Sequence, residues 1–210
     1  KPFDADWENW SLPLGNGYLG ATVFGRNDTE RIQLTENSLS NKGLWGIGSL
    51  TGFAELYLDL DHHGYTHYKR ELSLDSAISS VKYDLDGVHY TRKYFASYPD
   101  KVLVVQLTAS QPGKITVNVR PIIPFLRNSD TMAVKGDGRS GKVMANGDLI
   151  TINGQMEYYK IDYEGQIKII PSGGQQLVSS DVDGLMRRGR LIHERIQGSP
   201  CFGGRQTQHD

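Results

Sequence analysis

The chain has 210 residues, with 23 lysine and arginine residues against 24 aspartate and glutamate residues, and a single cysteine. Its net charge of -1 lacks the basic excess of a general nucleic-acid binder or a polybasic membrane anchor. One cysteine excludes an intrachain disulfide and a cysteine-rich zinc site. No apolar run approaches the ~20 residues that cross a bilayer. We therefore expect neither nucleic acid nor a membrane span among its interactions.

Short runs with strand character follow one another from residue 19 to about residue 184. Turn residues separate them at intervals of roughly 8 to 15 residues, the spacing typical of an all-β sandwich or barrel. Few stretches have helical character, and Asp75–Lys82 is the best candidate for a short helical turn. The pattern predicts one large antiparallel β-sandwich domain over residues 1–184, with few short helices.

Glycine-containing turns predict several hairpins within this domain. The strongest hairpin signal is Asp86-Gly87 between two alternating runs, because glycine supplies the positive φ of a two-residue turn. Pro112-Gly113 predicts a second hairpin, which would pair Val102–Thr108 with Lys114–Arg120. Asn153-Gly154 predicts a third turn, followed by a strand pair over Tyr158–Tyr163 and Gln166–Ile170. Pro121 argues against an uninterrupted central strand.

The last 26 residues have a different composition. Residues 185–210 contain five arginines and no lysine, whereas residues 1–184 contain seven arginines and eleven lysines. Alternation also stops there. We interpret this segment as an irregular, Arg-rich tail. It is either non-native sequence, from a shifted reading frame or an artificial junction, or a mobile basic terminus.

Three polar motifs have ordinary structural explanations. Gly136–Lys142 resembles a phosphate-binding loop, but Val143 replaces the required Ser or Thr, so a hairpin loop is favoured. A loop with His62, His63 and His67 near Asp59 and Asp61 could offer metal ligands, but a solvated polar loop fits the spacing better. Asn27-Asp28-Thr29 fits the glycosylation pattern and predicts an exposed loop. The sequence thus nominates no catalytic residue, metal or cofactor.

Tryptophans near the N-terminus suggest contact with sugars. Trp7, Trp10 and Trp45 lie in glycine-rich or loop-like sequence. Indole rings can stack on sugar rings while neighbouring amide and acidic groups bind the hydroxyls. The alternative, which the sequence favours, is that they plug the end of the sandwich or a domain interface.

Five ordered segments resemble the N-terminal domain of glycoside hydrolase family 95, the α-L-fucosidase and α-L-galactosidase family. The resemblance covers about residues 7–108, with a weaker β-pattern to about residue 184. The matching segments are Trp10–Gly25, Glu30–Leu39, Leu56–Leu60, Tyr68–Ala77 and Asp86–Val104. In the family, a tryptophan and a Gly-Gly-Pro turn usually follow the second segment. Here Ser40–Trp45 stands in their place, which leaves the substrate class open because loops carry specificity.

The resemblance implies a non-catalytic role for this domain. In the family, the β-sandwich precedes a helical (α/α)6 barrel, and the barrel carries the acid and base of an inverting hydrolysis. The resemblance therefore implies a brace for a barrel absent from this chain, a fucosylated or galactosylated glycan as the parent enzyme's partner, and a secreted or periplasmic location. Loop residues of the sandwich could line the substrate cleft. The candidates are Trp10, Asn16, Glu36, Asn37 and Trp45.

Two other functions stay open. A free-standing carbohydrate-binding module would bind sugars without a partner domain, and a complete small β-sandwich enzyme would turn them over.

Overall fold

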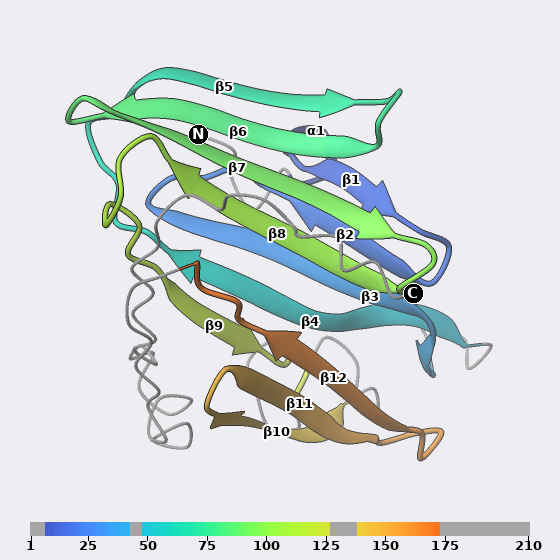
Figure 1. Ribbon diagram of the computed structural model, residues 1–210. Coiled ribbons are helices and arrows are strands. Elements are labelled where there is room, and N and C mark those ends of the chain that lie inside the picture. Colours follow the sequence, from blue (N-terminus) through green and yellow to red (C-terminus); the bar gives the residue numbers. More distant parts are fainter. Residues whose placement is uncertain (1–6, 43–47, 127–137, 173–210) are drawn as a thin grey trace, which may run out of the picture.

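The computed structural model describes residues 7–42, 48–126 and 138–172 and confirms an all-β fold (Figure 1). In these ranges the one helix, α1 (Trp7–Trp10), has four residues, and no helix is long and apolar enough to cross a membrane. The predicted tail and the domain boundary at residue 184 lie outside the described residues. The strands are β1 (Leu12–Gly15), β2 (Leu19–Val23), β3 (Thr29–Asn41), β4 (Ser49–Asp59), β5 (Thr66–Ser73), β6 (Ile78–Leu85), β7 (Val88–Ser97), β8 (Val102–Ala109), β9 (Asn118–Ile122), β10 (Arg139–Asn146), β11 (Leu149–Met156) and β12 (Asp162–Lys168).

Three antiparallel sheets make up the described fold. A five-stranded sheet has the order β1-β2-β3-β4-β9, and a four-stranded sheet has the order β5-β6-β7-β8. These two sheets lie face to face, with β1 and β2 in contact with β6, β7 and β8. A third sheet, β10-β11-β12, lies beside β4 and β9 (Figure 1). Gly165 of β12 lets this sheet approach β4, since a Cβ there would lie 2.4 Å from the Phe53 ring.

The core lies between the two larger sheets because alternate residues of their strands are apolar. Val23 and Ile32 of the five-stranded sheet are fully buried, as are Val81 and Tyr94 of the four-stranded sheet. The same continuous core reaches Ile152 of the third sheet.

The predicted hairpin at Asp86-Gly87 is confirmed. Leu85 pairs with Val88, and the two turn residues have φ values of 50° and 74°. Positive φ at both central positions is the geometry that matches the twist of the flanking strands. Pro121 lies in β9, an edge strand, where proline can be accommodated without breaking a central ladder.

Several local predictions are wrong. Val102–Thr108 and Lys114–Arg120 do not pair, because the chain crosses between sheets at Gly113: β8 pairs with β7, whereas β9 pairs with β4. The helical turn predicted over Asp75–Lys82 is a turn only at residues 74–77. From Ile78 onward the chain forms strand β6, since its alternation buries Ser79, Val81 and Tyr83.

The turn predicted at Asn153-Gly154 is also wrong, because both residues lie inside β11, and the turn falls at residues 157–161. Gly154 is a packing residue: a Cβ there would lie 2.0 Å from the Ser140 carbonyl oxygen and 2.6 Å from the Tyr163 hydroxyl. Strand β12 therefore pairs with β11, and the predicted pairing of Tyr158–Tyr163 with Gln166–Ile170 does not form.

A buried ion pair joins the two larger sheets. Glu30 of β3 is fully buried, and its carboxylate lies 3.5 Å from Nη1 of Arg92 on β7. The hydroxyl of Tyr94, also on β7, donates to Glu30 Oε2 at 2.6 Å. The other carboxylate oxygen accepts from the backbone N–H groups of Gly25 and Arg31 at 2.8 and 3.0 Å. A buried charge is tolerated only when it is paired and hydrogen-bonded. Both conditions hold for Glu30, whereas Nε and Nη1 of Arg92 have no hydrogen-bond partner.

The same arginine fixes the loop between β2 and β3. Arg92 Nη2 donates to the Arg26 carbonyl and to Asn27 Oδ1, both at 2.6 Å. From the edge of the four-stranded sheet, Tyr68 and Arg70 donate to the carbonyls of Gly25 and Phe24. Asn27 is only 1% exposed, so the prediction of an exposed loop at the glycosylation-like motif is wrong.

Replacing Glu30 by Gln tests this buried pair. Glu30→Gln keeps the shape of the side chain but leaves the buried Arg92 charge without its counter-charge. We expect the free energy of unfolding to fall by about 3 kcal/mol in urea denaturation. The same substitution at exposed Glu71, which pairs with Lys69 on the surface, should leave stability unchanged. Equal effects of the two substitutions would contradict the role given to Glu30.

Candidate functional site

Asn16 locks together two turns that belong to different sheets. It lies in the β1–β2 turn, and its Nδ2 donates to the Ser97 carbonyl at the end of β7 at 2.6 Å. Its Oδ1 accepts from the backbone N–H groups of Tyr18 and Leu19 at 3.0 and 2.8 Å. The side chain is 9% exposed. Asn16 is thus a positioning residue for this end of the sandwich, and its role as a substrate contact stays a prediction.

Glu36 and Asn37 lie beside the same turn, in the middle of β3. Asn37 donates from its backbone N–H to the Tyr18 carbonyl at 3.0 Å and from Nδ2 to the Gly17 carbonyl at 2.8 Å. Glu36 accepts from the backbone N–H and the hydroxyl of Ser38. Asn37 and Ser38 are exposed. The structure therefore brings three of the five nominated residues together at one end of the sandwich.

The two nominated tryptophans are not part of this group. Trp10 ends α1 and is 46% exposed. Because Trp10 precedes β1 and Asn16 follows β1, the two residues lie on the order of 15 Å apart along the strand. Trp45 falls in residues 43–47, outside the described residues.

Two tyrosines that the sequence did not nominate stand at the locked turns. Tyr18 of the β1–β2 turn and Tyr98 of the β7–β8 turn have ring centroids 6.0 Å apart, and they are 38% and 65% exposed. Lys101 Nζ lies 4.5 Å from the centroid of the Tyr18 ring. We call Tyr18, Tyr98 and Lys101 the tyrosine platform. In the sequence, Tyr98 stands beside Pro99 and Tyr18 stands beside Gly17, which marks both tyrosines as turn residues. Nothing in the sequence shows that the two turns meet.

The tyrosine platform is rigid and open to solvent. Ser97 Oγ donates to Asp100 Oδ2 at 2.6 Å within the β7–β8 turn, and Lys101 adopts a left-handed φ of 55°. Exposed aromatic rings present an apolar face with a polar hydroxyl at the edge, which suits the mixed surface of a sugar ring. Because the turns are fixed before binding, little conformational entropy would be lost on contact with a ligand.

Arginines neutralise the carboxylates that face away from the core on β4. Arg31 donates to both carboxylate oxygens of Glu55, and Tyr57 donates to one of them. Burial alone would raise the pKa of Glu55, but the hydrogen bonds from Arg31 and Tyr57 hold that pKa below its ordinary value. Asp59 is paired with Arg120 in the same way. Glu55 is therefore a structural anion, unlike a general acid, whose pKa must be raised.

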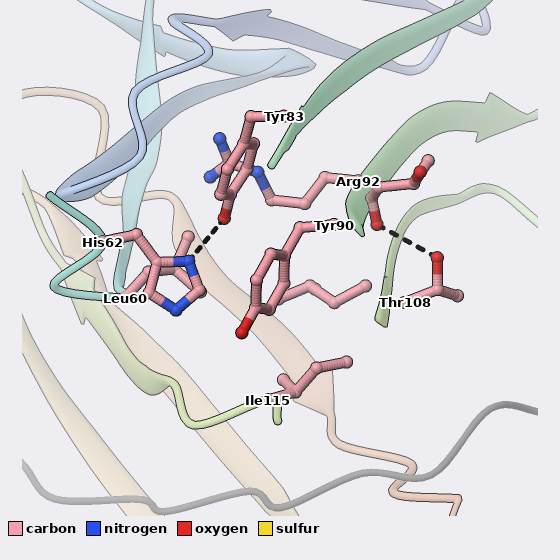
Figure 2. Close-up of a pocket in the computed structure, with 9 residues that line it drawn as sticks. Leu60, His62, Tyr83, Tyr90, Arg92, Thr108 and Ile115 are labelled. Atoms are coloured by element: carbon pink, nitrogen blue, oxygen red, sulfur yellow. Dashed lines mark hydrogen bonds between the residues drawn. The ribbon is translucent and has the colours of Figure 1, made fainter. Parts of the chain in front are cut away.

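Figure 2 shows a cavity near His62, between the two larger sheets. Its volume is about 10 Å³, room for at most about one water molecule. The Tyr83 hydroxyl lies 2.6 Å from His62 Nδ1, and the His62 ring lies 4.6 Å from the Tyr90 ring. Burial raises the pKa of Tyr83 to about 12, so this hydroxyl keeps its proton, and the direction of its hydrogen bond with Nδ1 depends on the tautomer of the imidazole ring. The cavity is thus an aromatic packing site, too small for a sugar.

The other three histidines in the described ranges make exposed pairs with carboxylates. His63 contacts Asp61 at 2.8 Å, and both His67 and His89 contact Asp84, at 2.9 and 2.7 Å. His67 therefore joins a group on β6 and β7 instead of the loop with Asp59 and Asp61. The described part of the chain contains no group of three side chains arranged to hold a metal ion.

These features define a β-sandwich domain whose locked end presents tyrosines suited to sugar rings. A sequence model of the family described as glycosyl hydrolase family 65, N-terminal domain, matches residues 4–45 and 46–187. The chain belongs to this family. The predicted glycoside hydrolase N-terminal domain is confirmed, and the narrower assignment to family 95 stays a prediction.

Two curated relatives are similar to part of the chain. Alpha-L-fucosidase 2 from Arabidopsis thaliana is 26% identical over 159 residues, which is 56% of this chain and 19% of the relative. Probable alpha-fucosidase A from Aspergillus niger is 27% identical over 142 residues, 48% of this chain and 18% of the relative. The matched region thus spans about a fifth of the length of each relative.

Substitution of Asn16 should release the locked turns. Asn16→Ala removes all three side-chain hydrogen bonds and leaves partly buried backbone groups unpaired, so we expect a loss of about 2 kcal/mol in the free energy of unfolding. Hydrogen exchange at the Tyr18 and Leu19 amides should accelerate. Asn37→Ala, at the exposed neighbouring position, should cost less than half as much. A larger effect at Asn37 would refute the positioning role of Asn16.

Stability should depend on pH through His62. Burial, followed by the positive charge of Arg92, lowers the pKa of His62 below its ordinary value of 6.5. The unfolded chain therefore takes up this proton at a higher pH than the folded chain. The resulting stability is fully present above pH 6.5 and is lost as the pH falls through the lowered pKa.

The test compares urea midpoints at about pH 5 and about pH 7.5. His62→Gln should reduce the drop in midpoint on acidification, whereas His63→Gln, at an exposed position, should leave the drop unchanged. An unaltered pH profile in His62→Gln would contradict this assignment.

Proposed function

We propose that this chain is the non-catalytic N-terminal β-sandwich of a glycoside hydrolase that resembles the inverting α-L-fucosidases of family 95. The observation that carries the proposal is the similarity to two fucosidases over about a fifth of their length, together with the family match. In this proposal a helical barrel carries the catalytic acid and base. The sandwich braces that barrel.

The paired carboxylates support a non-catalytic role. An inverting hydrolase needs two carboxylates about 6.5 to 9.5 Å apart, with room for a water molecule between them and a raised pKa on the acid. Each of Glu30, Glu55 and Asp59 is instead paired with an arginine, and the pKa of Glu55 is held below its ordinary value.

We propose that the tyrosine platform is the edge of the sandwich that faces the substrate cleft. Tyr18 and Tyr98 would contact sugar rings, and exposed Asn37 lies beside them on β3. In this proposal the partner is a fucosylated or galactosylated glycan bound by the whole enzyme, which is secreted or periplasmic.

The exposed tyrosine pair also favours a second candidate function, a free-standing carbohydrate-binding module. Such an aromatic surface could bind sugar without a barrel.

Activity assays distinguish a non-catalytic domain from a chain that hydrolyses glycosides by itself. We expect no release of fucose from an α-L-fucoside by the 210-residue chain alone. We expect inverting hydrolysis by a longer product of the same gene that also carries the helical barrel. In that longer protein, Tyr98→Ala should raise KM several-fold with little change in kcat, because it removes binding common to the ground and transition states. Exposed Ile170, outside the platform, provides the control Ile170→Ala, which should change neither constant.

Turnover by the isolated chain would overturn the proposal and point to a complete small enzyme. A gene whose intact frame encodes no helical domain, together with sugar binding by the chain alone, would favour the free-standing module.

A further inference from the structure

A second pair of exposed tyrosines lies at the turn between β11 and β12. Tyr158 and Tyr159 are 47% and 42% exposed, and their rings meet edge to face with centroids 4.8 Å apart at 81°. We call them the hairpin tyrosines. The proposed function does not use them, and they belong to the third sheet, whereas the tyrosine platform belongs to the two larger sheets.

The hairpin tyrosines are held in place by their surroundings. Lys42 Nζ lies 5.7 Å from the centroid of the Tyr158 ring. The Tyr159 hydroxyl packs against Gly48, where a Cβ would lie 3.1 Å away and where φ is +79°. Backbone hydrogen bonds from Met156 to the Ile161 carbonyl and from Lys160 to the Met156 carbonyl close the turn. Both rings are therefore ordered while a large part of each stays open to solvent.

The same hairpin carries an open depression of about 450 Å³. The last strand pair before the turn is Gln155 with Asp162, so along the chain Gln155 lies within about 11 Å and Asp162 within about 14 Å of Tyr158. Gln155 Nε2 donates to Asp162 Oδ1 at 2.9 Å. Amide, carboxylate and hydroxyl groups dominate the side chains that line the depression, among them Ser140, Asn153, Gln155, Asp162 and Glu164.

We propose that the β11–β12 hairpin is a second carbohydrate-binding site, specific for neutral oligosaccharides. One sugar ring stacks on the hairpin tyrosines, and hydroxyls of the adjoining ring bind Asp162 and Gln155 in the depression. Aromatic rings combined with a few fixed polar groups are the usual composition of a small-molecule site. Asp162 and Glu164 repel anions, so sugars with carboxylate groups bind less well.

Polar composition argues against a protein partner at this surface. Charged residues are depleted at the centre of protein–protein interfaces, whereas here two carboxylates line the depression and Lys42 covers one tyrosine ring. The site does not depend on a catalytic barrel, and it stands apart from the proposed contact at the tyrosine platform.

Calorimetry with the 210-residue chain tests this site. The probes are a fucosylated oligosaccharide, a galactosylated oligosaccharide and an acidic oligosaccharide of the same length. We expect a Kd near the millimolar range for at least one neutral probe. Tyr159→Ala and Asp162→Asn should each weaken that binding at least five-fold, and the acidic probe should bind at least five-fold more weakly than the neutral one.

Matched variants separate this inference from the proposed function. Ile170→Ala, at an exposed apolar position outside the turn, should not change the affinity. The Tyr98→Ala variant should still bind the neutral probe at the β11–β12 hairpin, whereas the Tyr159→Ala variant should lose this binding. If Tyr98→Ala abolishes all binding and the hairpin variants change nothing, the second site is refuted while the cleft proposal stands. Absence of binding to every neutral probe, with the chain folded by circular dichroism, also refutes it and leaves the bracing role untouched.

Discussion

The buried Glu30–Arg92 ion pair is the interaction on which the rest of the sandwich depends. Glu30 lies in the five-stranded sheet, and Arg92 and Tyr94 lie in the four-stranded sheet, so the charge pair fixes how the two sheets face each other. Removing either charge would leave the other buried without compensation, which is far more costly than losing a surface pair. The loop before β3 is built around the same two side chains.

Sheets fixed in this way bring turns from different parts of the chain to one end of the molecule. The β1–β2, β7–β8 and β11–β12 connections all lie at this end (Figure 1). The exposed tyrosines of the first two turns meet there, and Asn16 bonds these two turns directly to each other. A packed core thus supports turns that are ordered before any ligand arrives, which is the usual division between a scaffold and a binding surface.

Sequence patterns predicted the features that local chemistry determines. The all-β class and the Asp86-Gly87 hairpin followed from alternation and from positive φ, which are local properties. Gly154 was misread as a turn because a glycine needed for close packing has the same local signal as a glycine needed for a turn. Asn16 was nominated as a ligand contact, but its amide is used by the Ser97 carbonyl of a distant turn.

Contacts between distant turns explain why the tyrosines escaped prediction. Tyr18 and Tyr98 are unremarkable turn residues until the two sheets are packed.

The most direct test of sugar binding at the exposed turn tyrosines is an NMR titration of the chain, labelled at its tyrosine rings, with a neutral fucosylated oligosaccharide. The ring signals of the exposed turn tyrosines should shift, while those of buried Tyr83 and Tyr94 should not. Shifts confined to other tyrosines, such as Tyr57 on the outer face of β4, would contradict it.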